Sequence, residues 1–250
     1  MREAPIFRHI AKEETGSTNA DCLECARLGD PGNLWITAMR QTAGRGRSGR
    51  SWTSASGNLF ASVLLVDPAP PAGLANLAFV CALAASDAVI RAAEIFGAPC
   101  AVSLKWPNDV MIDGSKVAGI LLESAVLGKK NAVVAGFGVN CASRPDDTHY
   151  PATHLAAHGI DIPPADLFSI LSACFSERLG QWDRGTGFLA IRDDWLARAA
   201  GVGAAIVARL PDREISGTFA GVDEEGYLIL KSPDTGVHRI GAADIFFRQS

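Results

Sequence analysis

The segment Gln41-Thr42-Ala43-Gly44-Arg45-Gly46-Arg47-Ser48-Gly49-Arg50-Ser51-Trp52 combines glycine, arginine and tryptophan at short intervals. Between Met39 and Val66 the chain has four arginines and no acidic residue. Glycine lets the backbone turn sharply and approach a ligand closely, and arginine presents a fixed fork of donors that matches carboxylate and phosphate oxygens. The segment therefore predicts a loop that binds a polyanion, with an aromatic ring within reach of the same ligand.

Three other interpretations of this loop are possible. A solvated basic loop would rarely combine this glycine spacing with a tryptophan, and a single-strand nucleic-acid patch fits poorly with a formal net charge of −4 and a short basic run. Gly44–Gly49 also matches the dinucleotide fingerprint G-x-G-x-x-G, which requires a helix directly after the glycines. Residues 50–58 are instead rich in Ser, Thr and Gly and lead into a strand pattern. We therefore interpret the segment as an anion-binding loop between two strands.

Length and composition indicate a globular protein of 250 residues with 48% hydrophobic residues, enough for one large domain or one domain and a small appendage. No basic region followed by an apolar one opens the chain, so we expect no signal peptide and a cytoplasmic location. The apolar region Leu74–Ile90 contains Asn76 and Asp87 and is too polar to span a bilayer. The six cysteines are scattered and are expected to be free, mostly buried thiols rather than disulfides or a metal site.

The chain alternates strand and helix patterns up to residue 200. Short apolar runs bounded by Gly, Pro or Asp predict strands at Ile6–Glu13, Leu34–Arg40, Asn58–Val66, Val102–Trp106, Lys116–Glu123 and Asn131–Asn140. Apolar residues at helical spacing predict helices from the cap at Ser17 or Thr18 to Leu28, and over Leu74–Phe96, Pro163–Trp182 and Phe188–Ala200.

Several of these strands end in polar residues. The segment Lys105-Trp106-Pro107-Asn108-Asp109 follows one strand, and Pro107 removes a ladder N–H, which predicts a bulge beside a site. Asp113-Gly114 predicts a hairpin turn before the strand that begins at Lys116, and another strand ends in Asn140. A rigid sheet that presents Lys, Asp and Asn at its strand ends is expected to form a shared cleft.

The pattern changes after Gly201-Val202-Gly203. Four short strands, Ala205–Leu210, Glu214–Val222, Tyr227–Leu230 and Val237–Ile240, are separated by turn residues. They predict a small β-barrel or sandwich, and hence two domains, residues 1–200 and 201–250.

With these motifs in order, the chain resembles the biotin protein ligases (biotin–acetyl-CoA-carboxylase ligases) over nearly its whole length. The resemblance rests on four motifs: Ser17-Thr18-Asn19, Gly44–Trp52, Lys105–Asp109 and Lys116-Val117-Ala118-Gly119-Ile120-Leu121. Some members carry an N-terminal helix-turn-helix and act as repressors. Only 16 residues precede Ser17 here, so we expect the form that is a ligase alone.

The resemblance implies an α+β fold in which helices flank a mixed β-sheet, related to class II aminoacyl-tRNA synthetases, with a small C-terminal β-barrel. It also implies ATP-dependent attachment of biotin to a lysine of a biotin carboxyl carrier protein through biotinyl-AMP, with Mg²⁺ accompanying ATP. We expect a monomer or homodimer that uses neither nucleic acid nor a membrane. The alternatives are a lipoate or octanoate ligase or transferase of related fold, and a non-catalytic biotin-binding protein.

The resemblance also assigns roles to residues. Lys116 is expected to lie against the biotin carboxylate and the phosphate, Arg47 to cover phosphate oxygens, and Asp109 to bind Mg²⁺, to deprotonate the acceptor lysine, or to orient Lys105 or the arginine loop. These three are the implied catalytic residues. The implied biotin and ATP contacts are Ser17, Thr18 and Asn19 at the ureido head, Gln41 and Arg45 in the biotin site, Trp52 by the adenosine, Asn140 near the adenine, and the motif residues Gly44, Gly46, Arg47, Arg50, Lys105, Asn108, Lys116 and Gly119.

Overall fold

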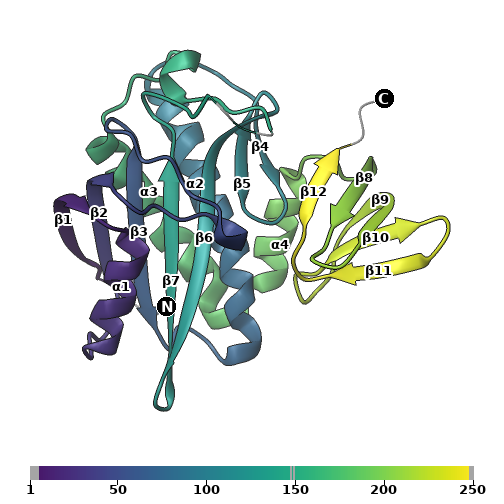
Figure 1. Ribbon diagram of the computed structural model, residues 1–250, viewed down its shortest axis with the longest axis horizontal. Helices are drawn as coiled ribbons and strands as arrows, with labels where there is room; N and C mark the ends of the chain where they lie inside the picture. The colour runs from purple at the N-terminus through teal and green to yellow at the C-terminus, as the bar shows by residue number, and fades with distance from the viewer. Residues whose placement is uncertain (1–5, 147, 149, 248–250) are drawn as a thin grey trace.

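A seven-stranded mixed sheet forms the centre of the protein, for which a computed structural model describes residues 6–146, 148 and 150–247 (Figure 1). The strand order is β1-β2-β3-β7-β6-β5-β4. Strands β1 and β2 pair in parallel, and every other neighbouring pair in this sheet is antiparallel. The strands are β1 (Arg8–Thr15), β2 (Leu34–Gln41), β3 (Leu59–Val66), β4 (Val102–Lys105), β5 (Asp109–Ile112), β6 (Ser115–Leu127) and β7 (Lys130–Val139). The predicted mixed sheet flanked by helices is confirmed.

Helices cover both faces of this sheet, which explains why the central strands are apolar on both sides. Helix α1 (Thr18–Arg27) packs on one face in a small buried cluster with residues of β2, β3 and β7. Helices α2 (Leu77–Ile95) and α3 (Pro164–Trp182) pack on the other face, and α4 (Phe188–Ala197) packs against α2 (Figure 1). Residues 71–95 are apolar enough to cross a membrane, but 67% of the most apolar window is buried inside the fold. This segment is therefore a core helix.

The C-terminal residues form a second, five-stranded antiparallel sheet beside β4, β5 and α4 (Figure 1). Its strands are β8 (Ala205–Arg209), β9 (Glu214–Val222), β10 (Leu228–Ser232), β11 (Gly236–Ile240) and β12 (Asp244–Phe247), in the order β11-β10-β9-β8-β12. The sequence predicted the first four strands and missed β12. Buried residues of this sheet belong to the same hydrophobic cluster as α2 and β7. The division into domains at residue 200 stays a prediction.

The local predictions around the strand ends need two corrections. Pro107 does not sit in a bulge; it follows a cis peptide bond in the turn between β4 and β5, and the irregular register lies between Val110 and Met111. Ser17 occupies the N-cap position of α1, but its side chain makes no capping hydrogen bond. The Asp113-Gly114 hairpin turn is confirmed, with positive φ at both residues. All six cysteines are free, and four of them are buried, as expected.

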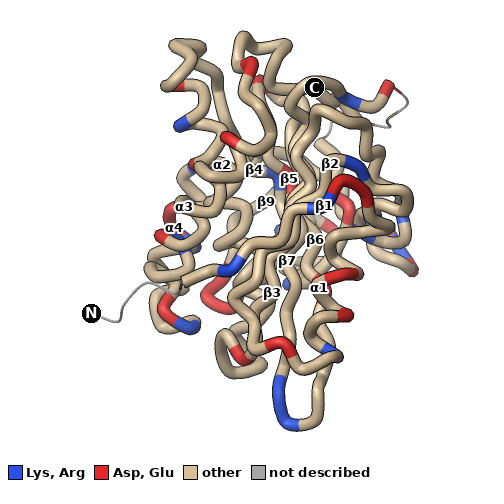
Figure 2. The backbone as a smooth tube through the Cα atoms, turned by 90° about the vertical axis from the view of Figure 1, so that its left-hand side faces the viewer, with Lys and Arg blue, Asp and Glu red and all other residues tan. Residues whose placement is uncertain are grey.

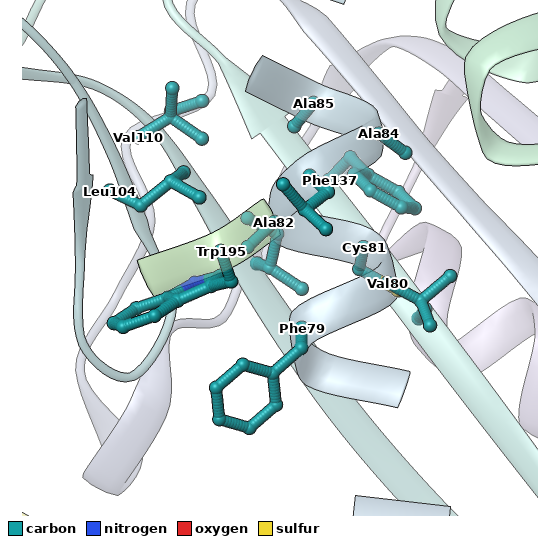
Figure 3. Close-up of a cluster of buried hydrophobic side chains, with 14 of the residues drawn as sticks. Phe79, Val80, Cys81, Ala82, Ala84, Ala85, Leu104, Val110, Phe137 and Trp195 are labelled. Carbon is teal, nitrogen blue, oxygen red and sulfur yellow. The ribbon is translucent and has the colours of Figure 1, made fainter. Parts of the chain in front are cut away.

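The second helix begins later than the sequence predicted. A 3-10 helix, Pro71–Asn76, precedes it, and α2 itself starts at Leu77 rather than Leu74. The short apolar residues of α2 allow close packing against the sheet: Cys81, Ala82, Ala84 and Ala85 are almost completely buried. Figure 3 shows these small side chains beside Leu104, Val110, Phe137 and Trp195.

Replacing Leu104 by Ala should lower the free energy of unfolding by about 2–5 kcal/mol, because it deletes a completely buried side chain and leaves a cavity (Figure 3). The matched control is Leu189→Ala, since the Leu189 side chain of α4 is 53% exposed; it should change the free energy by less than about 0.5 kcal/mol. Urea denaturation of both variants measures the difference. Equal effects of the two substitutions would show that the packing around Leu104 is not as described.

Candidate active site

A cleft lies where the arginine loop (Gly44–Trp52) crosses the ends of β6 and β7 and meets β12. Fourteen of the sixteen predicted site residues line it, namely Ser17, Thr18, Asn19, Gln41, Arg45, Gly46, Arg47, Arg50, Trp52, Lys105, Asn108, Asp109, Lys116 and Gly119. These residues come from the start of α1, from the arginine loop and the β4–β5 turn, and from strands β2, β4, β5 and β6, which the fold brings together. The sequence motifs mark a single site.

A pair of glycines forms the floor of the cleft. Gly119 of β6 and Gly138 of β7 are directly opposite each other in the sheet, and the indole of Trp52 lies over both. A Cβ atom at Gly138 would lie 2.5 Å from Trp52 Cε2, and one at Gly119 would lie 3.0 Å from Trp52 Cζ3. Only glycine permits this approach of a ring to the sheet. The glycine pair is therefore the floor of a flat slot, and the indole of Trp52 occupies the part of the slot directly above the two glycines.

One end of the slot is closed by buried polar side chains. Ser62 Oγ lies 2.7 Å from Thr18 Oγ1 and 2.6 Å from Asn19 Oδ1. Gln41 Oε1 accepts from the Thr18 backbone N–H at 2.9 Å and from its hydroxyl at 3.1 Å. A Cβ atom at position 136 would lie 2.1 Å from Asn19 Oδ1, so Gly136 makes room for that amide. Thr18, Asn19 and Gln41 line the cleft, and the fully buried Ser62 supports them from behind; these four residues are called the polar end of the cleft.

An acidic side chain connects the polar end to the arginine loop. Glu123 Oε2 accepts from Asn19 Nδ2 at 2.8 Å and from Arg45 Nη2 at 3.0 Å. The carboxylate therefore orients the amide of Asn19 and neutralises Arg45. Arg45 lies against β6 beside the slot and borders its polar end.

The other end of the cleft carries cations. Lys116 Nζ lies 2.6 Å from Asp109 Oδ1, and it faces the rings of Trp52 and Tyr150 at 5.4 and 5.1 Å from their centroids. Both members of the ion pair are largely buried, at 12% and 19% side-chain exposure. Asp109 thus pairs with Lys116, a partner that the sequence did not predict for it. An anion that entered here would meet a fixed, poorly solvated ammonium.

Arg47 and Lys105 add two more cations at this end. Arg47 Nη1 donates to Asn108 Oδ1 at 3.1 Å, and its Nη2 donates to the carbonyl of Ala243 at 3.3 Å. Burial lowers the pKa of Arg47 and also the pKa of Lys105 below their ordinary values. Burial of cations without full pairing is unfavourable, so this end is arranged to receive negative charge.

Two predicted site residues do not line the cleft. Gly44 is buried at the base of the arginine loop, where its carbonyl accepts from the Trp52 N–H at 2.9 Å. Asn140 donates from Nδ2 to the Thr153 carbonyl at 3.0 Å, and its backbone N–H pairs with Val117. It braces the segment behind Lys116 rather than facing the slot. Its proposed contact with adenine is therefore not supported by its position.

Four functional candidates were not predicted from the sequence: Ser62, Glu123, Tyr150 and Asp244. Ser62 could have been found as a lone polar residue in an apolar strand, and Glu123 as the acid that ends the Lys116 motif strand. Tyr150 lies outside any predicted element, and Asp244 begins the strand that was missed. Neither of these two carried a signal in the sequence.

Figure 2 shows basic and acidic residues interspersed along the described backbone. Among residues 6–146, 148 and 150–247, no group of three or more His, Cys, Asp or Glu could hold a metal ion. The cleft combines a polar end, a flat slot and a cationic end. It can therefore hold a molecule with a hydrogen-bonding head and an anionic tail, next to a second polyanion.

Comparison with known proteins agrees with this description. Residues 18–140 match the Biotin/lipoate A/B protein ligase family, and residues 202–248 match the Biotin protein ligase C terminal domain. The chain is 42% identical to the biotin–[acetyl-CoA-carboxylase] ligase of Paracoccus denitrificans, over 93% of this chain and 98% of the relative. It is 36% identical to the enzyme of the same name from Mycobacterium tuberculosis, over 87% of this chain and 80% of the relative.

Solved structures show the same similarity. The biotin protein ligase from Aquifex aeolicus in complex with biotin and ATP superposes with a TM-score of 0.79 at 28% identity, covering 97% of this chain and 99% of that one. The ligase from Leishmania major in complex with biotinyl-5-AMP superposes with a TM-score of 0.65 over 94% of this chain and 99% of that one. At 24% identity, the second similarity concerns the fold alone.

Proposed function

This chain belongs to the biotin/lipoate A/B protein ligase family, and we propose that its cleft activates biotin with ATP and delivers it to a protein lysine. It is a biotin–[acetyl-CoA-carboxylase] ligase. In the first step the biotin carboxylate attacks the α-phosphate of ATP, which gives biotinyl-AMP and pyrophosphate. In the second step a lysine amine of the acceptor attacks the acyl carbon and releases AMP. The observation that carries this proposal is the slot with a polar end and a cationic end.

The polar end suits the ureido head of biotin. That head both donates and accepts hydrogen bonds, and Thr18, Asn19 and Gln41 offer hydroxyl and amide groups that one another and Ser62 hold in place. A buried polar ring favours a ligand that pairs with it and disfavours one that leaves it unpaired. A fatty-acyl or lipoyl group would remove water from these groups without offering them hydrogen bonds. The polar end therefore supports biotin over lipoate or octanoate.

The cationic end suits the first chemical step. A carboxylate and a triphosphate must approach each other, and their repulsion is strong in a poorly solvated cleft. We propose that Lys116 lies between the biotin carboxylate and the α-phosphate, leaving Asp109 as the ligand enters. Arg47 covers phosphate oxygens with its planar fork. Preorganised charges of this kind lower the barrier because they need no rearrangement during the reaction.

The residues also fit Mg²⁺ that arrives with ATP. Within the described part of the chain, the carboxylates that line the cleft are Asp109 and Asp244. Protein sites usually hold Mg²⁺ through one or two carboxylates together with substrate phosphates, and Asp109 is the one at the cationic end. When bound, the ion would neutralise phosphate charge. Lys116 and Arg47 act on the same oxygens from the protein side.

The acceptor and cellular context follow from the same proposal. We propose that the acceptor is a lysine of a biotin carboxyl carrier protein in the cytoplasm, and that the ligase is a monomer or homodimer without nucleic-acid or membrane partners. Of the two carboxylates that line the cleft, Asp109 lies at the cationic end and could also accept a proton from the acceptor amine. Its pairing with Lys116 at 2.6 Å supports a role as a charge partner in the ligand-free protein.

Replacing Asn19 by Ala should weaken biotin binding by roughly tenfold to a hundredfold, because it removes one hydrogen-bonding partner of the ligand and leaves Thr18 as the remaining partner of Ser62. Affinity for ATP alone should change little, since Asn19 lies at the other end of the slot. Isothermal titration with each ligand measures both constants. The matched control is Asn76→Ala, a buried asparagine at the start of α2. Biotin binding by Asn19→Ala as tight as by the control would contradict the assignment of the polar end.

The proposed function is tested by exchange of labelled pyrophosphate into ATP, which requires only the first step. Exchange should depend on biotin, and lipoate or octanoate should not support it. Exchange with lipoate but not biotin would mean that the polar end was wrongly interpreted. Tight biotin binding without any exchange would indicate a biotin-binding protein without ligase activity.

A further inference from the structure

We propose that Asp244 of the C-terminal sheet is a positioning residue that holds the arginine loop closed through its ion pair with Arg50. Closure in this way would retain biotinyl-AMP until the acceptor lysine arrives. The inference rests on the proposed function, since it concerns the intermediate of that reaction. Asp244 would act through Arg50 and the loop, without itself taking part in bond making.

The contacts between the loop and the C-terminal sheet carry this inference. Arg50 Nη2 pairs with Asp244 Oδ2, and Arg47 Nη2 donates to the carbonyl of the preceding residue, Ala243, at 3.3 Å. The Ala243–Phe246 segment also lines the cleft itself. The C-terminal sheet is therefore a wall of the active site, and the loop touches it at two neighbouring residues.

The wall that carries Asp244 is fixed, whereas the tip of the loop is exposed. Strand β12 pairs with β8 along its whole length, and Ile245 is buried in the shared core. Ser48, Gly49 and Arg50 are exposed, and the first two have positive φ values of 55° and 73°. A fixed carboxylate can therefore restrain the exposed end of the loop.

Backbone hydrogen bonds connect the two sides of the loop, so restraint at Arg50 extends to the rest of it. Arg45 and Ser51 form an antiparallel bridge, and the Gly46 N–H donates to the Arg50 carbonyl at 2.7 Å. The Trp52 N–H donates to the Gly44 carbonyl at 2.9 Å. This ladder ties Arg50 to both ends of the loop. Release of the Arg50 side chain would free the segment that covers the slot.

The three loop arginines have different side-chain partners, and this separates their roles. Arg45 pairs with Glu123 at the polar end, and Arg47 contacts Asn108 at the cationic end. Both contacts lie where a ligand must bind, so they change when the ligand enters. The Arg50–Asp244 pair lies at the rim, with side-chain exposures of 54% and 27%. It can persist with or without ligand.

Retention matters because biotinyl-AMP is a mixed anhydride. Water that adds to its acyl carbon breaks the bond to the phosphate oxygen and gives biotin and AMP, with one proton released. A closed loop excludes water and prevents escape of the intermediate. When the loop opens early, AMP forms without transfer of biotin. The ratio of AMP formed to biotin transferred therefore measures closure.

The experiment measures this ratio in the full chain with ATP, biotin and a limiting amount of biotin carboxyl carrier domain. Asp244→Asn and Arg50→Gln should each raise the ratio by about twofold to fivefold, the range expected for loss of a partly exposed ion pair. The wild-type ratio should rise toward theirs as salt is added, because salt screens such a pair. The matched control is Arg239→Gln, which removes the ion pairs with Asp223 and Glu225 near β11, the strand at the opposite edge of the same sheet from β12.

A charge reversal separates positioning from simple destabilisation. The double variant Arg50→Asp with Asp244→Arg restores opposite charges at the two positions, and its ratio should return toward that of the wild type. The inference would be overturned if the single variants had the same ratio of AMP to transferred biotin as the control. It would also be overturned if the ratio of the double variant were as high as that of the single variants. A wild-type chain that forms no AMP from ATP and biotin would instead contradict the proposed function, so the two failures can be told apart.

Discussion

Replacing Lys116 by Ala is expected to slow the formation of biotinyl-AMP by about 100- to 1,000-fold, the usual effect of losing one preorganised charge donor. The ammonium is largely buried, and it is held by Asp109 at 2.6 Å and by the rings of Trp52 and Tyr150. Its position is therefore set before any ligand binds. Biotin-dependent pyrophosphate exchange under saturating substrates measures the loss.

Part of this loss should come from the carboxylate left behind. In Lys116→Ala, Asp109 would lie unpaired and would repel both anionic substrates. The double variant Lys116→Ala with Asp109→Asn removes that repulsion, and it should recover part of the activity but not the wild-type rate. Full recovery would mean that Lys116 only neutralises Asp109.

A lysine with a similar partner outside the cleft provides the control. Lys12 Nζ lies 2.9 Å from Asp21 Oδ2, on the N-terminal part of the chain. Lys12→Ala should leave the exchange rate within about twofold of the wild type, since partly exposed ion pairs contribute little. Near-native exchange by Lys116→Ala would rule out its assignment as the main charge donor.

Replacing Arg47 by Ala should slow the same step by at least about 100-fold. The Arg47 side chain reaches Asn108 and the Ala243 carbonyl, which hold its fork at the cationic end. Arg47→Lys keeps the charge but loses the planar pair of donors, so it should recover only part of the rate. An equal rate for Arg47→Lys and wild type would show that only charge matters there.

The control for Arg47 is a nearby arginine that points away from the cleft. Arg40, near the end of β2, pairs with Glu14 at 3.1 Å, and both side chains are more than half exposed. Arg40→Ala should have little effect on exchange. A comparable loss in both variants would indicate that the substitutions disturb the fold around β2 and the loop rather than the chemistry.

The sequence predicted most of the catalytic sheet because its strands are short apolar runs bounded by Gly, Pro or Asp. The central strand β3 is buried along nearly its whole length, and its observed bounds differ from the prediction by one residue. The short strand β12 was missed. It is only four residues long, and two of them are exposed aromatic residues. Its existence depends on pairing with β8, which no local pattern reveals.

The parts of the candidate site that the sequence predicted are those in which several functional residue types stand close together in one motif. The arginine loop and the Lys105–Asp109 segment carry charge, glycine and aromatic residues at close intervals, and the fold brings them together. Tyr150 reaches Lys116 from an irregular segment, so only the tertiary structure places it there. Asn140 followed a strand end as expected, yet its amide turns to the Thr153 carbonyl. The direction of a side chain at a strand end is set by packing rather than by sequence.

Transfer of labelled biotin to a biotin carboxyl carrier domain with MgATP tests the central claim most directly. The protein should label one lysine of the domain, lipoate should not compete, and labelling should be about 100- to 1,000-fold slower in Lys116→Ala while Lys12→Ala retains it. A near-native rate of labelling by Lys116→Ala, or transfer of lipoate in place of biotin, would contradict the account of a polar end that selects biotin and a cationic end that activates it.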